Sequence, residues 1–355
     1  MINFLDGNEA IARAAVHAGC DFFAGYPITP ATSIFHHMLQ LLPPSGGVCM
    51  QGEDEIGSIG FCLGASMGGA MAMTATSGPG ISLFSEHISF AIGSEIPIVI
   101  VDVQRLGPST GSATKGADGD IQFLRWGNSG GLPVIVLAPV DVRDCYILTS
   151  HAFNLAETYR CPVFIASNKE IGMTRESIIV EDIDLPESRK RQTAPRLLPM
   201  QKGSELSRLT SSTHGPDGYI TADTGQIENR IKHLQDKFQN SGVDFCYYNF
   251  DEQVDSTLLL ITYGVTARAA TDAVSTLRTQ GEKVSLLVLK TLYPVGRDII
   301  SYALDGKEKI LVIEMNCGQY VREIERIAAN KSIQFLGRMN GELITPSQIL
   351  EVLQS

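Results

Sequence analysis

The chain has 355 residues, of which 44% are hydrophobic and 19% charged, and its net charge at pH 7 is −11. This length allows two globular domains of ordinary size, and the acidic balance argues against nucleic acid or an anionic membrane as the main partner. The longest apolar runs have strand length, well below the roughly 20 residues of a membrane-spanning helix, so no span is predicted.

The first residues carry Asp6 and Glu9, where a secretory signal would have a basic head and an uninterrupted apolar core. We therefore expect the N-terminus to be the first helix of the fold. From there to about residue 180, helical patterns alternate with short apolar strands. The predicted helices begin at Asn8, Ala31, Glu55, Ile81 and Asp141, and the predicted strands lie near Phe22 and Met71 and at 98–103, 134–137 and 163–166.

This alternation predicts an α/β domain with a doubly wound, mostly parallel sheet at residues 1–180. Residues 181–255 change in character and are interpreted as a connecting arm with a polar helix at 226–238. Regular alternation then returns, with buried strands at 256–264, 283–295 and 309–316, a helix at 266–280, and a helix start at Thr345. Residues 256–355 are therefore predicted to form a second, smaller α/β domain.

The seven cysteines are scattered and contain no CxxC pair, which favours a reducing cytoplasm and provides no framework for zinc or an iron-sulfur cluster. The seven histidines have no metal-ligand spacing either. We therefore predict no metal site on this chain. Any cluster that the function needs must be held by another chain.

A stiff corner, Tyr26-Pro27-Ile28-Thr29-Pro30, follows the predicted strand at Phe22. Each proline fixes its own φ and excludes the residue before it from the helical region. Ligands of doubly wound folds bind at the carboxyl ends of strands, and this corner lies at such an end.

A second informative stretch is the helix that begins at Glu55, which has Glu53 and Asp54 just before it. Considered alone, three carboxylates at a helix start are best explained as partners of the helix dipole. The helix is, however, rich in glycine, which weakens it and lets a ligand or another backbone come close.

Two further strand ends carry polar loops. Ser-Gly-Pro-Gly at 77–80 could meet an anion through its backbone but lacks both phosphate-loop spacings, so a structural turn is equally consistent. Arg105 opens a long loop rich in glycine and serine, and a loop of this length is more often functional than idle. An arginine there can hold a carboxylate with two hydrogen bonds.

Several stretches together resemble the alpha subunit of the 2-oxoacid:ferredoxin oxidoreductases, in order and over nearly the whole chain. These stretches are GNEAIARAAVHAGCDFFAGYPITP, the Glu55 helix, SGPGISL, RLGPSTG, LAETYRCPV, THGPDGY, LLLITYG and EMNCGQY. The resemblance implies a pyrimidine-binding domain for thiamine diphosphate, followed by a transketolase C-terminal-like domain. It also implies a beta subunit that carries the diphosphate-binding domain, Mg²⁺ and a [4Fe-4S] cluster, and this chain lacks the corresponding GDG and cysteine motifs.

By the same resemblance, Glu55 is the glutamate that activates the cofactor, and Pro27 and Ile28 line its aminopyrimidine. Thr29 and Arg105 resemble the residues that hold the substrate carboxylate. The implied function is the oxidative decarboxylation of a 2-oxoacid to an acyl-coenzyme A, with electrons passed to ferredoxin in a cytoplasmic αβ or α2β2 assembly. Substrates of both the 2-oxoglutarate and the branched-chain type are compatible, with 2-oxoglutarate favoured.

Three other interpretations remain open from the sequence. The small subunit of a 2-oxoacid dehydrogenase decarboxylase has the same domain order and also supplies a glutamate to thiamine. A non-catalytic assembly subunit would keep the fold and lose the chemistry, although Thr29, Glu55 and Arg105 are all present. A nicotinamide-dependent dehydrogenase is disfavoured because no glycine fingerprint follows the first strand.

Overall fold

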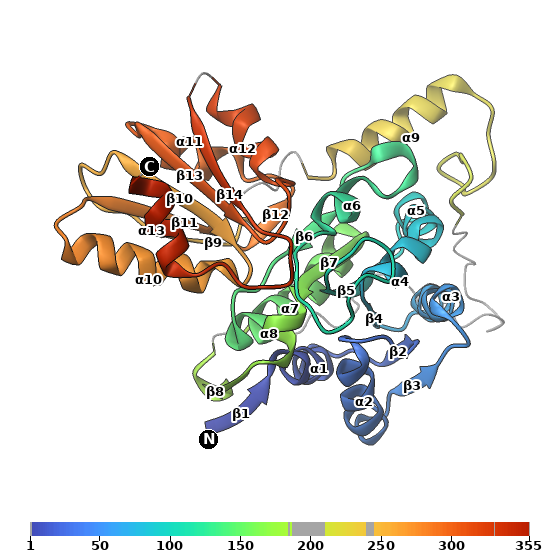
Figure 1. Ribbon diagram of the computed structural model, residues 1–355. Coiled ribbons are helices and arrows are strands. Elements are labelled where there is room, and N and C mark those ends of the chain that lie inside the picture. Colours follow the sequence, from blue (N-terminus) through green and yellow to red (C-terminus); the bar gives the residue numbers. More distant parts are fainter. Residues whose placement is uncertain (1, 184, 187–209, 239–244, 330, 355) are drawn as a thin grey trace.

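The structure is a computed structural model that describes residues 2–183, 185–186, 210–238, 245–329 and 331–354. In these residues the chain forms a seven-stranded sheet, a five-stranded sheet and a two-stranded ribbon (Figure 1). The seven-stranded sheet has the order β12 (Thr291–Tyr293), β6 (Ile135–Leu137), β7 (Pro162–Asn168), β5 (Ile98–Gln104), β4 (Ala72–Thr76), β2 (Phe22–Gly25), β3 (Val48–Gln51). All its neighbours run parallel except β12, which is antiparallel to β6.

Helices cover both faces of this sheet, which confirms the predicted doubly wound fold. Alternate strand residues contribute to two separate hydrophobic clusters. One cluster includes α1 (Gly7–His17), α2 (Thr32–Leu41) and α7 (Val142–Tyr159). The other includes α3 (Glu55–Met67), α4 (Pro79–Leu83), α5 (Ser85–Gly93) and α6 (Ile121–Trp126). The period-two alternation of strand side chains gives each face its own core.

The N-terminus differs from its prediction, because a strand precedes the first helix. β1 (Ile2–Asp6) pairs antiparallel with β8 (Arg175–Ile179), which follows the short helix α8 (Lys169–Met173). The helix start is close to the predicted one, because Asp6 accepts a hydrogen bond from the Glu9 amide and so caps α1. Three short 3₁₀ turns complete this part: η1 (Pro43–Ser45), η2 (Ser129–Gly131) and η3 (Val180–Asp182).

The second sheet has the order β14 (Ile333–Gly337), β13 (Lys309–Glu314), β10 (Leu258–Tyr263), β11 (Val284–Leu289), β9 (Tyr248–Asp251). It is parallel apart from β9. Its helices are α10 (Thr266–Thr279), α11 (Arg297–Leu304), α12 (Val321–Ala328) and α13 (Pro346–Gln354). β9 belongs to this sheet although it lies inside the 181–255 segment that the sequence analysis treated as an arm.

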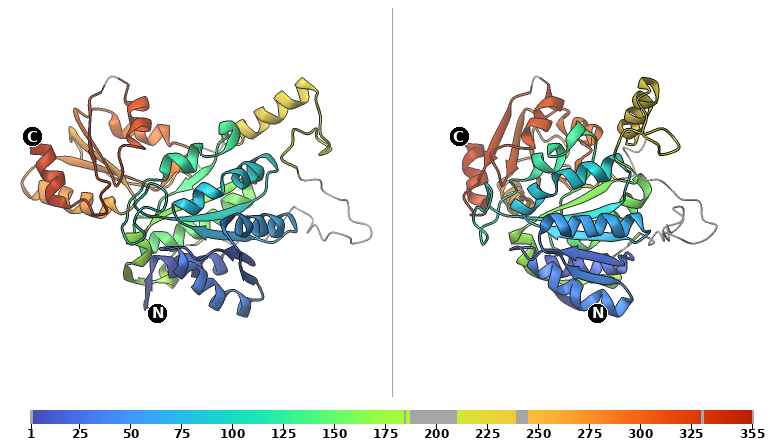
Figure 2. Two further views of the ribbon diagram at one scale, coloured as in Figure 1. Left: turned by 45° about the vertical axis from the view of Figure 1, so that its right-hand side comes forward. Right: turned by 90° about the vertical axis from the view of Figure 1, so that its right-hand side faces the viewer.

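A short strand, β12, takes the chain from the second sheet to the first, and it was predicted only as part of a longer strand. Residues 283–295 were predicted as one strand, but the chain divides after Leu289, and β12 crosses to the edge of the first sheet beside β6. Figure 2 shows the resulting two lobes, blue to green and orange to red. No helix in the described part of the chain combines the length and the apolar character that a membrane crossing needs.

The polar helix predicted in the arm is α9 (Thr224–Asp236), which lies beside α5 (Figure 1). Glu95, just after α5, holds α9 in place through ionic contacts. Its carboxylate lies 2.6 Å from Arg230, 2.7 Å from Lys237 and 2.9 Å from His233. Burial opposes ionisation of Glu95, but Lys237 and its other partners outweigh it and lower the pKa to about 2. Residues 187–209 and 239–244 of the arm lie outside the described residues.

Candidate active site

The corner at residues 26–30 connects the end of β2 to α2. Pro30 is buried, whereas Thr29 is exposed, and its hydroxyl has no partner among the described residues. The fully buried side chain of Asn8 on α1 stabilises the corner, because its Nδ2 donates to the Pro30 carbonyl at 3.0 Å and to Ser33 Oγ at 2.7 Å. Asn8 was not predicted as a site residue, because a polar residue in the first turn of a helix, here beside Asp6 and Glu9, gives no signal of its own.

Arg105 directly follows β5 and is only 6% exposed. Its Nη1 donates to the Thr29 carbonyl at 2.6 Å, and its Nη2 donates to the Thr110 carbonyl at 2.8 Å. The structure thus brings together two residues that the sequence analysis assigned to one substrate group. A guanidinium has five N–H donors, so these contacts leave others available, and Nε has no partner among the described residues.

The three carboxylates at the start of α3 have different surroundings. Asp54 is the helix cap, because its Oδ1 accepts from the Gly57 amide at 2.7 Å, and Glu53 is exposed. Glu55 faces the turn after β4, since a Cβ built on Gly80 would lie 3.2 Å from Glu55 Oε1. No hydrogen bond or ion pair to the Glu55 carboxylate occurs among the described residues. Asp54 therefore serves the helix start, and the Glu55 carboxylate is free to meet a ligand.

The end of β4 and the turn after it carry two buried hydroxyl groups. Thr76 Oγ1 and Ser77 Oγ are buried and have no partner in the described structure. Gly80 is required there, because a Cβ at this position would lie 2.0 Å from Thr76 Oγ1. The turn at 77–80 is therefore closely packed against the β4 end and the Glu55 side chain.

These residues lie at the carboxyl ends of four neighbouring strands. Thr29 follows β2, Glu55 follows β3, the 77–80 turn follows β4 and Arg105 follows β5, in a sheet whose order is β5-β4-β2-β3. This edge is where a doubly wound sheet offers its ligand site. The arrangement combines an acceptor carboxylate, free hydroxyls and a buried guanidinium, which suits a ligand with both a basic ring nitrogen and a carboxylate.

Large apolar side chains are exposed on α3, on α4 and in the corner at residues 26–30. Ile56 and Phe61 on α3 are each 45% exposed, and Leu83 on α4 is 47% exposed. Tyr26 in the corner is 38% exposed. Ile59, one turn after Ile56 on α3, is buried. Exposed apolar side chains of this size are candidates for burial in a protein interface.

Three buried carboxyl groups lie behind Arg105 and were not predicted. Burial raises the pKa of Asp102 and, to about 6, that of Asp120; the charge of Asp120 raises the pKa of Asp102 further, and Arg105 opposes the rise at Asp120. Burial also raises the pKa of Asp118 to about 7. Their signal in the sequence is weak, because acidic residues in a glycine-rich loop are normally solvated.

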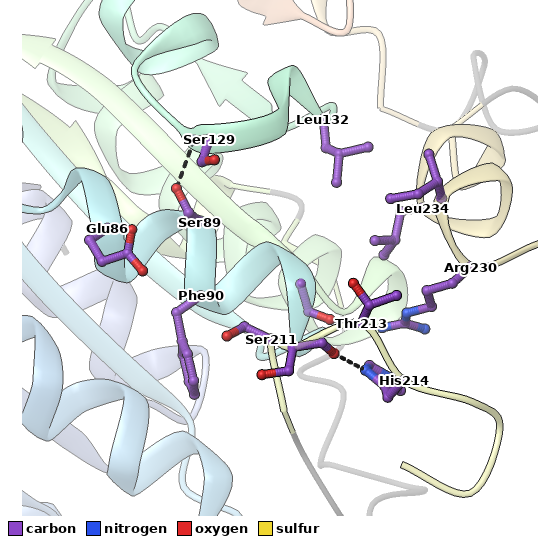
Figure 3. A pocket seen from close by; sticks show the side chains of 13 residues that line it. Glu86, Ser89, Phe90, Ser129, Leu132, Ser211, Thr213, His214, Arg230 and Leu234 are labelled. Atoms are coloured by element: carbon purple, nitrogen blue, oxygen red, sulfur yellow. Dashed lines mark hydrogen bonds between the residues drawn. The ribbon is translucent and has the colours of Figure 1, made fainter. Parts of the chain in front are cut away.

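A separate pocket of about 240 Å³ lies between α5, η2 and α9 (Figure 3). Ser89, Phe90, Ser129, Thr213 and Arg230 are among its lining side chains, and none of the predicted site residues lines it. The Ser129 amide donates to Ser89 Oγ, and His214 Nδ1 bonds the Ser212 carbonyl. This pocket is therefore distinct from the strand-end site.

One group among the described residues has a geometry that could hold a metal ion, namely Asp6, Glu9 and His37. Two of its three members already have other partners, since Asp6 caps α1 and Glu9 pairs with Arg13 at 2.8 Å. The group lies outside the strand-end site, and we assign no metal to it.

Relatives of known family cover nearly the whole chain. It is 39% identical to the 2-oxoglutarate synthase subunit KorA of Methanothermobacter marburgensis, over 98% of this chain and 97% of the relative. It is 34% identical to the ketoisovalerate oxidoreductase subunit VorB of Methanothermobacter thermautotrophicus, over 98% of this chain and 96% of the relative.

Among solved structures, the chain matches the 2-oxoglutarate:ferredoxin oxidoreductase from Magnetococcus marinus, solved with 2-oxoglutarate, coenzyme A and succinyl-CoA bound. The TM-score is 0.90 at 31% identity, and the match covers 99% of this chain and 65% of that one. A split-gene transketolase matches with a TM-score of 0.60 at 12% identity, which shows the shared fold.

Family comparison assigns both parts of the chain. Residues 257–349 match the pyruvate:ferredoxin oxidoreductase core domain II. Residues 13–237 match the pyruvate flavodoxin/ferredoxin oxidoreductase, thiamine diphosphate-binding family, and the chain belongs to this family of 2-oxoacid:ferredoxin oxidoreductase alpha subunits.

Proposed function

We propose that this chain is the alpha subunit of an enzyme that converts a 2-oxoacid, with 2-oxoglutarate favoured, and coenzyme A into an acyl-coenzyme A and CO₂. Two electrons leave the substrate and pass to ferredoxin through a beta subunit. The observation that supports this most strongly is the hydrogen bond from Arg105 to the Thr29 carbonyl, because it joins the two expected substrate-binding residues beside Glu55.

The residues at the strand ends fit thiamine diphosphate. Glu55 offers a carboxylate without a protein partner in the described structure, and Thr76, which like Glu55 packs against Gly80, offers a buried hydroxyl. Pro27 and Ile28 form a stiff, half-buried surface in the corner. When bound, thiamine diphosphate supplies a nucleophilic carbon and an electron sink for loss of the substrate carboxylate.

Each residue then has a defined task. Glu55 holds a proton at the pyrimidine ring nitrogen and so favours the tautomer that acts as the internal base. Pro27 and Ile28 pack against the pyrimidine ring. Arg105 and the Thr29 hydroxyl hold the substrate carboxylate, and the buried guanidinium strengthens this contact because few waters compete for it.

A second subunit supports the site from outside. Tyr26 and Ile56 lie next to the strand ends, and Phe61 and Leu83 are exposed further along α3 and α4, which suits burial against a protein partner. We propose that this partner is the beta subunit, that it brings Mg²⁺, the diphosphate-binding residues and the [4Fe-4S] cluster, and that the assembly is αβ or α2β2. All seven cysteines are free, which supports a reducing compartment such as the cytoplasm.

A branched-chain 2-oxoacid is the second candidate substrate. It is favoured by the 34% identity to a ketoisovalerate oxidoreductase subunit. The two candidates differ at the end of the side chain, where 2-oxoglutarate has a second carboxylate and the branched-chain acid has methyl groups.

Co-purification with the beta subunit, followed by an assay of coenzyme A-dependent dye reduction over a panel of 2-oxoacids, tests the proposal. We expect turnover from the complex, fastest with 2-oxoglutarate, and none from either chain alone. Calorimetry should detect little or no binding of thiamine diphosphate and Mg²⁺ to this chain alone. Tight binding by the isolated chain would contradict the divided site.

A further inference from the structure

The loop that follows Arg105, residues 105–120, determines where the Arg105 guanidinium lies. Two backbone hydrogen bonds of Leu106 close the loop: the Leu106 amide donates to the Lys115 carbonyl at 2.8 Å, and the Ser112 amide donates to the Leu106 carbonyl at 2.8 Å. Thr110, near the tip, accepts from Arg105 Nη2. Because the loop supplies one of the two carbonyls that hold the guanidinium, a shift of the loop would shift Arg105.

The far end of this loop is bonded to the C-terminal domain. The Asp118 amide donates to the Met315 carbonyl at 2.9 Å, and Asn316 Nδ2 donates to the Asp118 carbonyl at 2.8 Å. Gln319 Nε2 donates to the Gly119 carbonyl. In Figure 1 the teal loop runs beside the red segment before α13, in agreement with the close packing of Lys115 on Gly341.

Asn316 is itself held rigidly in the turn between β13 and α12. Its side chain is fully buried, and Nδ2 donates a second hydrogen bond to the Tyr263 hydroxyl at 2.8 Å. Its Oδ1 accepts from the Gly318 amide at 2.8 Å and from the Gln319 amide at 3.0 Å. All the hydrogen-bonding capacity of this amide is therefore used, and its orientation is determined.

Through Tyr263, Asn316 is connected to a hydrogen-bond network in the core of the C-terminal domain. Tyr263 donates to Glu314 Oε2 at 2.8 Å, and the same carboxylate accepts from the amides of Tyr320 and Val321 at 2.9 and 2.7 Å. These bonds lie within the C-terminal domain and stabilise it, whereas the hydrogen bond from Asn316 to the Asp118 carbonyl is the one that reaches the loop.

We propose that Asn316 is a positioning residue for 2-oxoacid binding, through which the C-terminal domain holds the 105–120 loop and thereby the Arg105 guanidinium. The inference rests on the proposed function of Arg105. It gives the C-terminal domain a part in substrate binding although Asn316 bonds to the loop backbone and not to the site itself.

Asn316→Asp is the direct test, carried out in the complex with the beta subunit. The carboxylate keeps the acceptor for the Gly318 and Gln319 amides, but it loses the donor to Asp118 and turns an oxygen toward that carbonyl. We expect the KM for the 2-oxoacid to rise about three- to tenfold, the loss of one or two hydrogen bonds, with a smaller change in kcat. The KM for coenzyme A should stay unchanged. Asn316→Ala, which removes the donor without adding a charge, should shift the same parameter.

Tyr263→Phe is the matched control. It removes one hydrogen bond of Asn316 and one of Glu314, but it leaves the contact between Asn316 and Asp118 in place. Its Tm should fall as it does for the Asn316 variants, while the KM for the 2-oxoacid stays within about twofold of wild type. Equal KM increases in Tyr263→Phe and in the Asn316 variants would show a general loss of stability and overturn the proposal.

A double-mutant cycle identifies Arg105 as the residue through which Asn316 acts. In an Arg105→Ala background, Asn316→Asp should raise the KM no further, because the group that it positions is gone. Additive effects would overturn the proposal. Hydrogen exchange adds a readout that needs no turnover, since the Leu106 and Ser112 amides should exchange faster in Asn316→Asp and not in Tyr263→Phe. Faster exchange in a complex that converts no 2-oxoacid would refute the proposed function while supporting the link between Asn316 and the loop.

Discussion

Arg105 Nη1 donates to the backbone carbonyl of Thr29 over 2.6 Å, although 76 positions separate the two residues in the chain. The contact joins the loop after β5 to the corner after β2, across the end of the intervening strand β4. It links a buried guanidinium to the backbone of a residue whose side chain is exposed. Both residues lie on the same strand-end edge as Glu55, as the proposed substrate site requires.

Glu55→Gln should lower turnover by orders of magnitude while the complex still assembles. An amide cannot take part in the proton exchange that drives the cofactor tautomer, whereas its shape and packing against Gly80 are nearly unchanged. Exchange of the cofactor's thiazolium proton, followed by quenched NMR, should slow in parallel. Glu53→Gln, at an exposed carboxylate two residues away, is the control and should behave as wild type. A wild-type exchange rate in Glu55→Gln would leave Glu55 with a structural role alone.

Arg105→Ala should weaken substrate binding rather than cofactor activation. The substrate carboxylate loses its charged partner, and a charge-assisted hydrogen bond contributes about 1.5 to 3 kcal/mol, or roughly ten- to a hundredfold in apparent affinity. Steady-state kinetics with 2-oxoglutarate would measure this effect, and Thr29→Ala should show a smaller one because its hydroxyl is neutral. Thiazolium proton exchange without substrate should stay at the wild-type rate, and slow exchange would place Arg105 on the cofactor instead.

Gly80→Ala should damage both stability and activity. Its new methyl would lie 2.0 Å from Thr76 Oγ1 and 2.9 Å from Glu55 Cγ, so both side chains must move. Overpacking of this kind costs about 1 to 3 kcal/mol of unfolding free energy. Thermal unfolding of the isolated chain should show the loss, and turnover of the complex should fall because Glu55 is displaced.

Adding Thr76→Ala to Gly80→Ala gives a double variant that lacks the hydroxyl with which the new methyl group clashes. It should restore part of the lost stability without restoring the position of Glu55. Full recovery of activity in the double variant would show that Glu55 had not been displaced.

Asp118→Asn should change how stability depends on pH. Burial raises the pKa of Asp118 to about 7 in the folded chain, from a usual value of 3.8, with smaller contributions from Glu314 and Asp120. The folded state thus binds the proton more tightly than the unfolded state. The resulting stability is complete below about pH 4 and is lost as the pH rises to about 7. Each pKa unit corresponds to about 1.4 kcal/mol, so the loss reaches a few kcal/mol.

The amide of Asp118→Asn does not ionise and can still accept from Asn168. The Tm of this variant, relative to wild type, should therefore rise between pH 5 and pH 7 and level off above pH 7. Asp272→Asn on the exposed face of α10 serves as the control and should show a constant difference. A constant difference for Asp118→Asn as well would mean that the carboxyl group is ionised throughout this range.

Helix starts were the most accurately predicted local features. Asp141 caps α7, and Thr345 precedes α13 as predicted, because a cap depends on a few consecutive residues. The same local pattern could not distinguish the roles of the three carboxylates at the start of α3. Asp54 and Glu55 are adjacent in the chain, but one binds its own helix and the other faces a turn from a different strand.

Local patterns of residues were sufficient to predict the alternation of helices and strands, the doubly wound sheet and the strand-end position of Thr29 and Arg105, since periodicity and turn residues act over short distances. They did not predict β3, and so not the strand-end position of Glu55, nor which groups meet across the sheet and between the domains. The contacts of Arg105 with Thr29 and of Asn316 with Asp118 join residues 76 and 198 positions apart. The pairing of β12 with β6 in the first sheet is likewise a contact between residues far apart in the chain. Such contacts depend on the burial and packing of the whole chain, which no local pattern of residues contains.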